Sequence, residues 1–110
     1  MTPERGALVW LDFDPQAGHE QAGRRPALVL TGARYYAATG LVIACPVTTK
    51  VKGYPLEVPL PEGLPVSGVV LANQARTLDW RARNAQVVGQ APETLLNDVL
   101  DVLAALLEQD

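Results

Sequence analysis

The residues best suited to chemistry in this chain are polar groups that stand where apolar runs begin or end. Glu20 lies five residues before Arg25, which opens the apolar run Pro26–Leu30, and Thr48-Thr49 closes the run Leu41–Val47. A guanidinium matches two oxygens of an anion such as a phosphate, and a nearby hydroxyl can add a hydrogen bond. Strand ends on a rigid scaffold are common positions for sites. By type and position, this set indicates an anion-binding site.

Further polar groups follow these runs. They are Lys50 and Lys52 after the threonines, Asn73, Gln74 and Arg76 after the run Val66–Ala72, and the stretch Asp79–Arg83. Each feature also has a plainer structural explanation. A nearby glutamate and arginine commonly form a surface ion pair, paired threonines are common at strand ends, and Trp80 suits a core position. Residue types and spacing alone leave both explanations open.

Several other chemistries lack the residues that they need. Cys45 is the single cysteine and His19 the single histidine, which excludes an internal disulfide and a structural zinc site of the usual Cys/His kind. Neither a nucleophile elbow nor a GxxxxGK[ST] phosphate loop occurs. No apolar run approaches the roughly 20 residues of a membrane-spanning helix, and the N-terminus leads into no signal-peptide core. We therefore expect a cytoplasmic protein that uses no metal and no other cofactor.

The charge is unevenly distributed along the chain. The net charge is −3, but residues 1–90 carry nine basic and seven acidic groups, whereas residues 91–110 carry five acidic groups and no basic one. Much of the acid is thus confined to one terminal segment. A basic face elsewhere remains possible, so the overall charge does not exclude a nucleic-acid partner.

The apolar runs predict a mainly β protein. The 110 residues fit one domain, 1–110. Six short strands are expected at Leu8–Asp14, Pro26–Leu30, Leu41–Val47, Leu56–Val58, Val66–Ala72 and Ala85–Gly89, with one helical turn within Ala33–Gly40. Pro26 fits the first position of a strand, where its missing N–H does least harm. Short strands with proline- and glycine-rich turns suggest a small, strongly curved barrel over about residues 5–90.

The last segment has a helical period instead. Leucines and valines recur at helical spacing at Leu95, Leu96, Val99, Val102, Leu103, Leu106 and Leu107, and the acidic residues lie off that stripe. Pro92 suits the first helical turn. We predict an amphipathic helix over about residues 92–108 that covers the barrel.

Four blocks in chain order resemble the MazF/PemK-type toxins. They are Gly6–Leu30, which carries a GxEQxGxRPxLVL pattern, then Pro46–Thr49, Gly53–Val58, and Leu71–Gln74 with Asp79–Arg83. The resemblance spans nearly the whole chain without a large insertion. It implies the SH3-like β-barrel of the MazF/CcdB-like toxin fold and a homodimer. It also implies a ribosome-independent endoribonuclease, an mRNA interferase, that cuts single-stranded RNA at short sequences and is inhibited by a cognate antitoxin.

The resemblance also implies roles for single residues. The family's catalytic arginine and threonine fall on Arg25 and Thr48, and its loop carboxylate falls on Glu20. RNA supplies its own nucleophile, the 2′-OH, so Arg25 and Thr48 would stabilise phosphate charge while Glu20 acts as general base. His19 is the alternative acid or base. No metal is required, and the expected products carry a 2′,3′-cyclic phosphate and a 5′-hydroxyl.

Basic, amide and aromatic groups outside the acidic helix are candidates for RNA binding. They are Lys50, Lys52, Tyr54, Asn73, Gln74, Arg76, Arg81 and Arg83, together with His19 and Arg24, where the sequence departs from the family pattern. The acidic C-terminal tail of an antitoxin would occupy the same basic path. Two alternatives remain. One is a non-catalytic barrel toxin that binds a protein target such as a DNA topoisomerase, and the other is a catalytically dead RNA- or antitoxin-binding module.

Overall fold

The structure is a computed structural model that describes residues 2–13 and 23–109. Strands and helices follow one another in the order β1 (Ala7–Asp12), β2 (Arg24–Val29), α1 (Ala33–Thr39), β3 (Leu41–Thr48), β4 (Glu57–Pro59), β5 (Val69–Leu71), the 3₁₀ turn η1 (Ala72–Gln74), β6 (Arg76–Asp79), β7 (Gln86–Gln90) and α2 (Glu93–Leu107). The predicted architecture, mainly β with a C-terminal helix, is confirmed.

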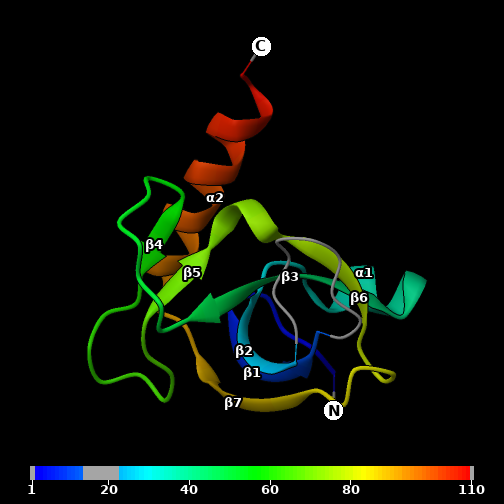
Figure 1. The fold of residues 1–110 in the computed structure, drawn as a ribbon. Helices are drawn as coiled ribbons and strands as arrows, with labels where there is room; N and C mark the ends of the chain where they lie inside the picture. Colours follow the sequence, from blue (N-terminus) through cyan, green and yellow to red (C-terminus); the bar gives the residue numbers. More distant parts are fainter. Residues whose placement is uncertain (1, 14–22, 110) are drawn as a thin grey trace.

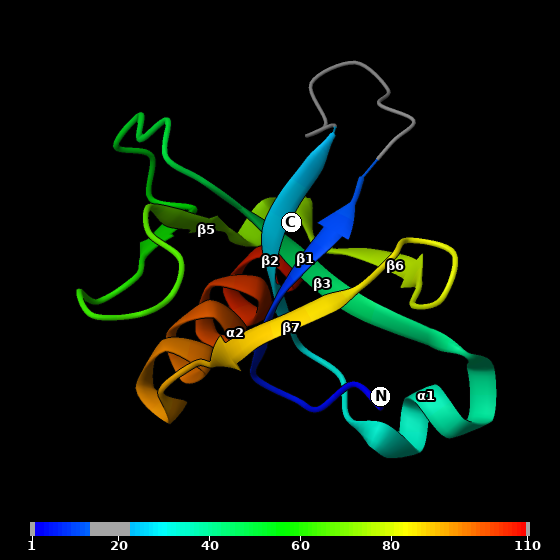
Figure 2. The same ribbon diagram turned by 90° about the horizontal axis from the view of Figure 1, so that it is seen from below.

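The sheet is strongly curved and antiparallel. Its strands run in the order β4-β5-β3-β2-β1-β7, and β6 pairs separately with β3. The eight-residue β3 makes this possible, because its first half pairs with β6 and its last two residues pair with β5. Figures 1 and 2 show how the sheet bends around β3 into a barrel-like shape. The strand path ends at β4 and β7, so the barrel stays open.

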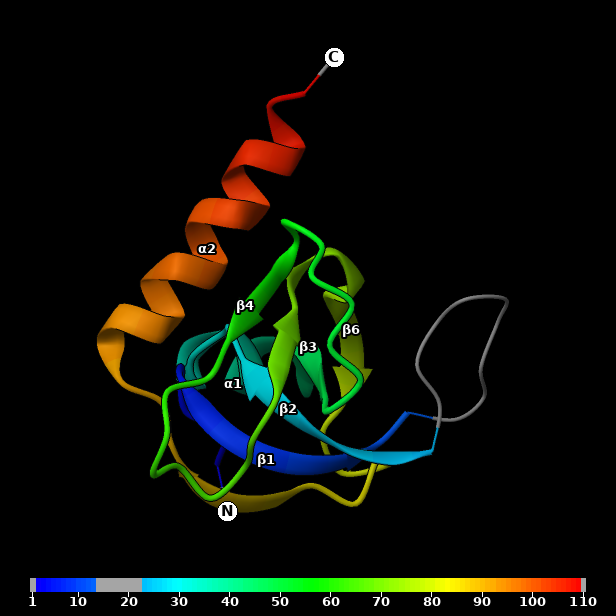
Figure 3. The same cartoon turned by 60° about the vertical axis from the view of Figure 1, so that its left-hand side comes forward.

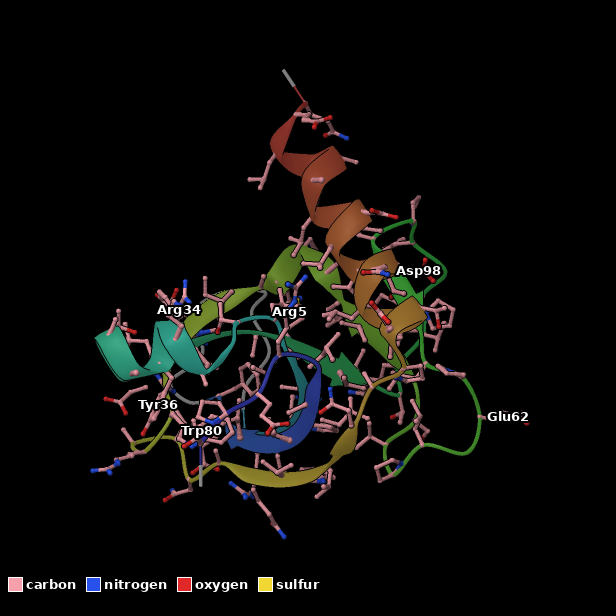
Figure 4. The ribbon with its side chains drawn as sticks, turned by 180° about the vertical axis from the view of Figure 1, so that it is seen from behind. Arg5, Arg34, Tyr36, Glu62, Trp80 and Asp98 are labelled. Atoms are coloured by element: carbon pink, nitrogen blue, oxygen red, sulfur yellow. The ribbon has the colours of Figure 1, made fainter. Side chains whose placement is uncertain are left out.

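The central strands are buried on both faces, which explains their consecutive apolar residues. Side chains alternate between the two faces of a strand. One core, which includes three α2 residues, takes Leu8, Leu28 and Cys45 from β1, β2 and β3. A second core takes Val9, Ala27 and Ala44 from the same strands and closes over Leu78 and Trp80. Tyr36 of α1 packs edge-on against Trp80, with ring centroids 6.5 Å apart (Figure 4).

The helix α2 lies against β4 and η1 (Figures 1 and 3). The helix was predicted over about residues 92–108; it begins at Glu93, with Pro92 as its N-cap, and buries Leu95, Leu96 and Val99. Its C-terminal turns extend beyond the sheet, where Leu107 is 84% exposed. Within residues 2–13 and 23–109, the structure contains no helix of the length and hydrophobicity needed to cross a membrane.

Some predicted boundaries were wrong. The first strand ends at Asp12. The run at Val66–Ala72 forms strand only at Val69–Leu71, because Gly68 has a φ of +113° and Ala72 begins a 3₁₀ turn. Pro26 is the third residue of β2 rather than its first. The ladder with β3 begins only at Ala27, so the missing N–H of the proline breaks no bond to β3.

The strand β6 was not predicted. Its sequence, Arg-Thr-Leu-Asp, has one buried side chain, Leu78, and no apolar run. It forms because Leu41–Ala44 of β3 offers a complementary edge about 35 residues earlier in the chain. The cause is long-range pairing, which a local pattern cannot reveal.

Candidate functional site

A pocket of about 570 Å³ lies where β2 and β3 end, beside β4, β5 and η1. Figure 3 shows β4 and β5 with the segment that links β3 to β4 running beside them. The pocket is lined by Arg25, Thr48, Lys50, Lys52, Tyr54, Leu56, Glu57, Leu71, Asn73 and Gln74. Its volume falls within the usual range for small-ligand sites. Below, these ten residues are called the pocket.

The pairing of β2 with β3 explains why Arg25 and Thr48 meet. Ala27 lies opposite Pro46 in this ladder. The paired stretch of β2 runs from Ala27 to Val29. If its register is continued by two residues past Ala27 and Pro46, Arg25 and Thr48 come to facing positions. Because side chains alternate with a period of two, both project on the face that Ala27 and Pro46 share. Residues 23 positions apart in the chain are thereby placed in one pocket.

Thr48 is held tightly at the end of β3. The residue is 5% exposed, and its hydroxyl oxygen accepts a hydrogen bond from the backbone N–H of Lys50 at 3.1 Å. Gly68 packs against its backbone so closely that an added Cβ would overlap the Thr48 carbonyl oxygen. The hydroxyl position is therefore fixed by the fold. Its own proton remains available to a ligand, because the oxygen serves as acceptor in the Lys50 contact.

The segment Lys50–Tyr54, called the pocket loop below, forms one wall. It has no regular secondary structure. The carboxylate of Glu57 accepts hydrogen bonds from two backbone N–H groups. The nitrogen of Lys52 lies 3.1 and 3.2 Å from the two carboxylate oxygens, and that of Gly53 lies 2.8 Å from Oε1. The loop is closed by a bond from the Glu57 N–H to the Tyr54 carbonyl at 3.0 Å. The loop thus turns back onto the first residue of β4.

The composition of the pocket suits an anion attached to a planar group. Three cationic side chains and one carboxylate line it. The carboxylate belongs to Glu57, which is already occupied by backbone donors. Tyr54 is 60% exposed and offers an aromatic face, while Asn73 and Gln74 offer amides. Cations contact phosphates, and aromatic and amide groups contact unstacked bases.

Four predicted RNA-binding arginines do not line this pocket. Arg24 forms an ion pair with Asp12, with Nη1 and Oδ1 3.1 Å apart. Arg83 donates from Nη1 to the Asp12 carbonyl at 3.4 Å. Asn84, which has a φ of +52°, donates to Asp12 Oδ2 at 2.8 Å. Asp12, Arg24, Arg83 and Asn84 are together called the Asp12 network below. The network joins the end of β1 to the start of β2 and to the β6–β7 turn.

The other two arginines lie near the second core. Arg76 donates from Nη1 to the Phe13 carbonyl at 3.4 Å, and its guanidinium carbon lies 5.9 Å from the centroid of the Phe13 ring. Arg81 is exposed and lines a separate hollow of about 360 Å³ beside Tyr36 and Trp80. The structure thus brings together seven of the predicted site residues and places four others elsewhere.

Two predicted residues, Glu20 and His19, lie outside the described residues. Within the described parts of the chain, no three His, Cys, Asp or Glu side chains gather closely enough to hold a metal ion. Cys45 is buried in the core, and this burial raises the pKa of its thiol to about 12. The thiol is therefore protonated at neutral pH and unsuited to act as a nucleophile.

Glu57 and Gly68 are parts of the site that sequence reasoning missed. Gly68 carried a signal, because a glycine inside an apolar run often marks a close approach of two backbones. Glu57 carried little signal, since its role depends on how the pocket loop folds back. The apolar lining residues Leu56 and Leu71 were interpreted only as strand residues.

Known proteins are similar to this chain in sequence and in fold. The family model for the PemK-like, MazF-like toxin of type II toxin–antitoxin systems matches residues 4–107. The endoribonuclease toxin MazF of Escherichia coli strain K12 is 50% identical over 94 residues, which cover 84% of this chain and 84% of that protein. A crystal structure of MazF from Deinococcus radiodurans is 57% identical, covers 99% of both chains and has a TM-score of 0.95.

A MazE–MazF complex from Deinococcus radiodurans is also similar. It is 56% identical, with a TM-score of 0.88, and the match covers 100% of this chain and 99% of that one. The MazF-type fold predicted from the sequence blocks is therefore confirmed. The family match spans most of the chain, so this protein belongs to the PemK-like, MazF-like toxin family of type II toxin–antitoxin systems.

Proposed function

We propose that this chain is an endoribonuclease toxin that cleaves single-stranded RNA in the pocket. The observation that carries the proposal is that Arg25 and Thr48 line one pocket, which Lys50 and Lys52 also line. Relatives that are 50% identical bear the name endoribonuclease. A protein-binding toxin without nuclease chemistry would not need this polar set at the ends of two strands.

The chemistry follows from what these side chains can do. The attacking 2′-OH belongs to the RNA, so the protein must orient it in line with the 5′-oxygen and stabilise the charge that develops on the phosphate. Arg25 is permanently charged and can bind two phosphate oxygens. The Thr48 hydroxyl can donate to a third. These two groups supply charge stabilisation without requiring a metal ion.

Proton transfer needs a further group. Glu20 is the proposed general base, with His19 as the alternative, because a guanidinium stays protonated at neutral pH and exchanges protons poorly there. Attack by the 2′-OH and departure of the 5′-oxygen would leave a 2′,3′-cyclic phosphate and a 5′-hydroxyl. Sequence preference would come from bases held by Tyr54, Asn73 and Gln74.

The test is cleavage of a mixed-sequence single-stranded RNA by the purified protein in excess EDTA. We expect cleavage, products that resist a 5′-phosphate-dependent exonuclease, and 3′ ends that become extendable only after the cyclic phosphate is removed. Arg25→Ala, purified identically, excludes a contaminating nuclease and should be slower by about 100-fold or more. Wild-type protein that leaves RNA intact, or a variant that cleaves at the wild-type rate, would overturn the proposal.

We also propose that an acidic antitoxin segment competes with RNA for the pocket. The D. radiodurans neighbours include MazE–MazF complexes, and the three pocket cations suit an acidic chain. No α2 residue lines the pocket, so the acidic helix leaves it open. Competition binding with an uncleavable RNA is the test. A ternary complex with unchanged affinities would place the inhibitor elsewhere.

A homodimer is the proposed assembly. Its support is the exposed apolar side chain of Leu107 on the projecting end of α2, and two-fold dimers are the commonest closed oligomers. Light scattering at micromolar concentration should give twice the chain mass of 11.8 kDa. A value near the mass of one chain would contradict the dimer.

A further inference from the structure

The pocket loop is held by its own backbone donors. Four successive N–H groups, from Lys50 to Gly53, each have an acceptor within the segment from Thr48 to Glu57. The N–H of Lys50 donates to the Thr48 hydroxyl and that of Val51 to the Thr49 carbonyl at 3.1 Å. The other two donate to Glu57. One carboxylate thus satisfies half of these donors.

This arrangement places a negative charge where a polyanion is expected to bind. Glu57 is the single acidic residue among the ten that line the pocket. By Coulomb's law alone, it repels phosphate, and its removal would strengthen RNA binding. By its hydrogen bonds, however, it holds the wall that carries Lys50, Lys52 and Tyr54. The two effects have opposite signs.

We propose that Glu57 is a positioning residue that sets RNA affinity by holding the pocket loop in its binding shape. The inference rests on the proposed function and deepens it. A loop that is ordered before binding loses less conformational entropy when RNA arrives. Carboxylate bonds to backbone N–H groups are charge-assisted and stronger than neutral ones. We therefore infer that the gain from a preformed wall exceeds the repulsion from one carboxylate.

Gly53 provides an independent route to the same loop. Its φ is +79°, a conformation that other residues adopt only with strain, and no atom beyond its two chain neighbours lies within 4 Å of where a Cβ would be. Gly53→Ala therefore strains the loop without changing charge and without a clash. Gly63 is a matched control, since it has a φ of +90° and equally open surroundings but lies outside the pocket loop.

Glu62 is the matched control for charge. It is exposed, lies at the tip of the loop between β4 and β5 (Figure 4), and does not line the pocket. Glu62→Ala removes the same charge as Glu57→Ala but leaves the pocket loop untouched. An increase in RNA affinity that comes only from removing a negative charge should appear in both variants. A decrease in RNA affinity caused by loss of the loop shape should appear only in Glu57→Ala.

The experiment measures the dissociation constant of a single-stranded RNA in which fluorine replaces every 2′-hydroxyl. We expect Glu57→Ala to bind about tenfold more weakly than wild type. Gly53→Ala should also bind more weakly, and Glu62→Ala and Gly63→Ala should bind as wild type or slightly better. With cleavable RNA, Glu57→Ala should raise KM while kcat stays within about twofold, because Arg25 and Thr48 stand on β2 and β3.

Amide hydrogen exchange measures directly how well the N–H groups of the pocket loop are protected. The N–H groups of Lys52 and Gly53 should lose protection in Glu57→Ala, while the amides of β1 keep theirs. If the wild-type protein binds RNA and Glu57→Ala, like Glu62→Ala, binds it equally well or more tightly, this inference alone is overturned. A wild-type protein that neither binds nor cleaves RNA would overturn the proposed function and this inference with it. If Glu57→Ala does not fold, unchanged binding by Gly53→Ala has the same force against the inference.

Discussion

The pocket and the Asp12 network use basic residues in opposite ways. In the Asp12 network, guanidinium groups contact the carboxylate and the backbone carbonyl of Asp12 and so join three chain segments. In the pocket, an arginine and two lysines converge on a space large enough for a ligand. The same residue type therefore acts as a structural tie in one region and as lining in the other. Which role a cation takes depends on where the fold places it, at the junction of three segments or at the lining of the pocket.

The largest expected effect concerns the hydroxyl of Thr48. Thr48→Val keeps the shape of the side chain but removes the donor to phosphate and leaves the Lys50 N–H without its acceptor. We expect the single-turnover cleavage rate to fall about 100-fold. Thr48→Ser keeps the hydroxyl and should stay within about fivefold of wild type. Equal loss in both variants would show that packing, rather than the hydroxyl, matters at this position.

The second prediction concerns Gly68, and separates the cost of its positive φ from the cost of losing its close contact with Thr48. Gly68→Ala would push a Cβ into the Thr48 carbonyl, so we expect the free energy of unfolding to fall by about 2 kcal/mol or more and RNA cleavage to fall with it. Gly63→Ala, at a similar φ but in open space, should cost about 1 kcal/mol and leave cleavage unchanged. Chemical denaturation and cleavage rates check both. Equal effects of the two changes would mean that the cost at Gly68 comes from its positive φ alone and not from its contact with Thr48.

The third prediction uses salt to compare cations inside and outside the pocket. Log K falls as log salt rises, with a negative slope. If Lys50 and Lys52 each contact one phosphate, replacement of either by alanine should make that slope less steep by about 0.7 for single-stranded RNA. Arg81→Ala removes a charge from the separate hollow beside Trp80 and should leave the slope unchanged. Affinity measured at four or more salt concentrations gives the slopes. A larger change for Arg81 than for the lysines would extend the RNA path outside the pocket.

The smallest expected effect is a pH dependence in the Asp12 network. Hydrogen bonds from the Asn84 amide and the Arg24 guanidinium lower the pKa of the Asp12 carboxyl below its ordinary value of 3.8. The resulting stability is present above the ordinary value and is lost as pH falls through the lower folded-state value. Asp12→Asn should therefore flatten the acid end of the stability curve slightly.

Thermal unfolding between about pH 5 and pH 2 measures this effect. The control is Asp98→Asn, which removes the same charge from α2 (Figure 4), outside the network. An identical acid profile for Asp12→Asn and wild type would show that these hydrogen bonds contribute nothing measurable to stability.

Residues whose neighbours in the chain determine their environment were predictable. The doubly buried strands at Leu28 and Val47 follow from consecutive apolar residues, and α2 follows from its leucine period. Arg25 and Thr48 were found through sequence blocks typical of a family, and the β2–β3 register explains why they meet. The division of the cations was not predictable, because it depends on long-range pairing. Arg83 meets Asp12 across 71 positions, and no local pattern indicates that contact.

The direct test of this account is a map of where RNA binds. Backbone amide resonances of the protein are recorded during titration with the fluorine-substituted single-stranded RNA. The account predicts the largest shifts at Thr48, Lys50, Lys52 and Asn73, with little change at Arg83 and Asn84. Large shifts at Arg83 and Asn84 with none at Thr48 and Lys50 would contradict it.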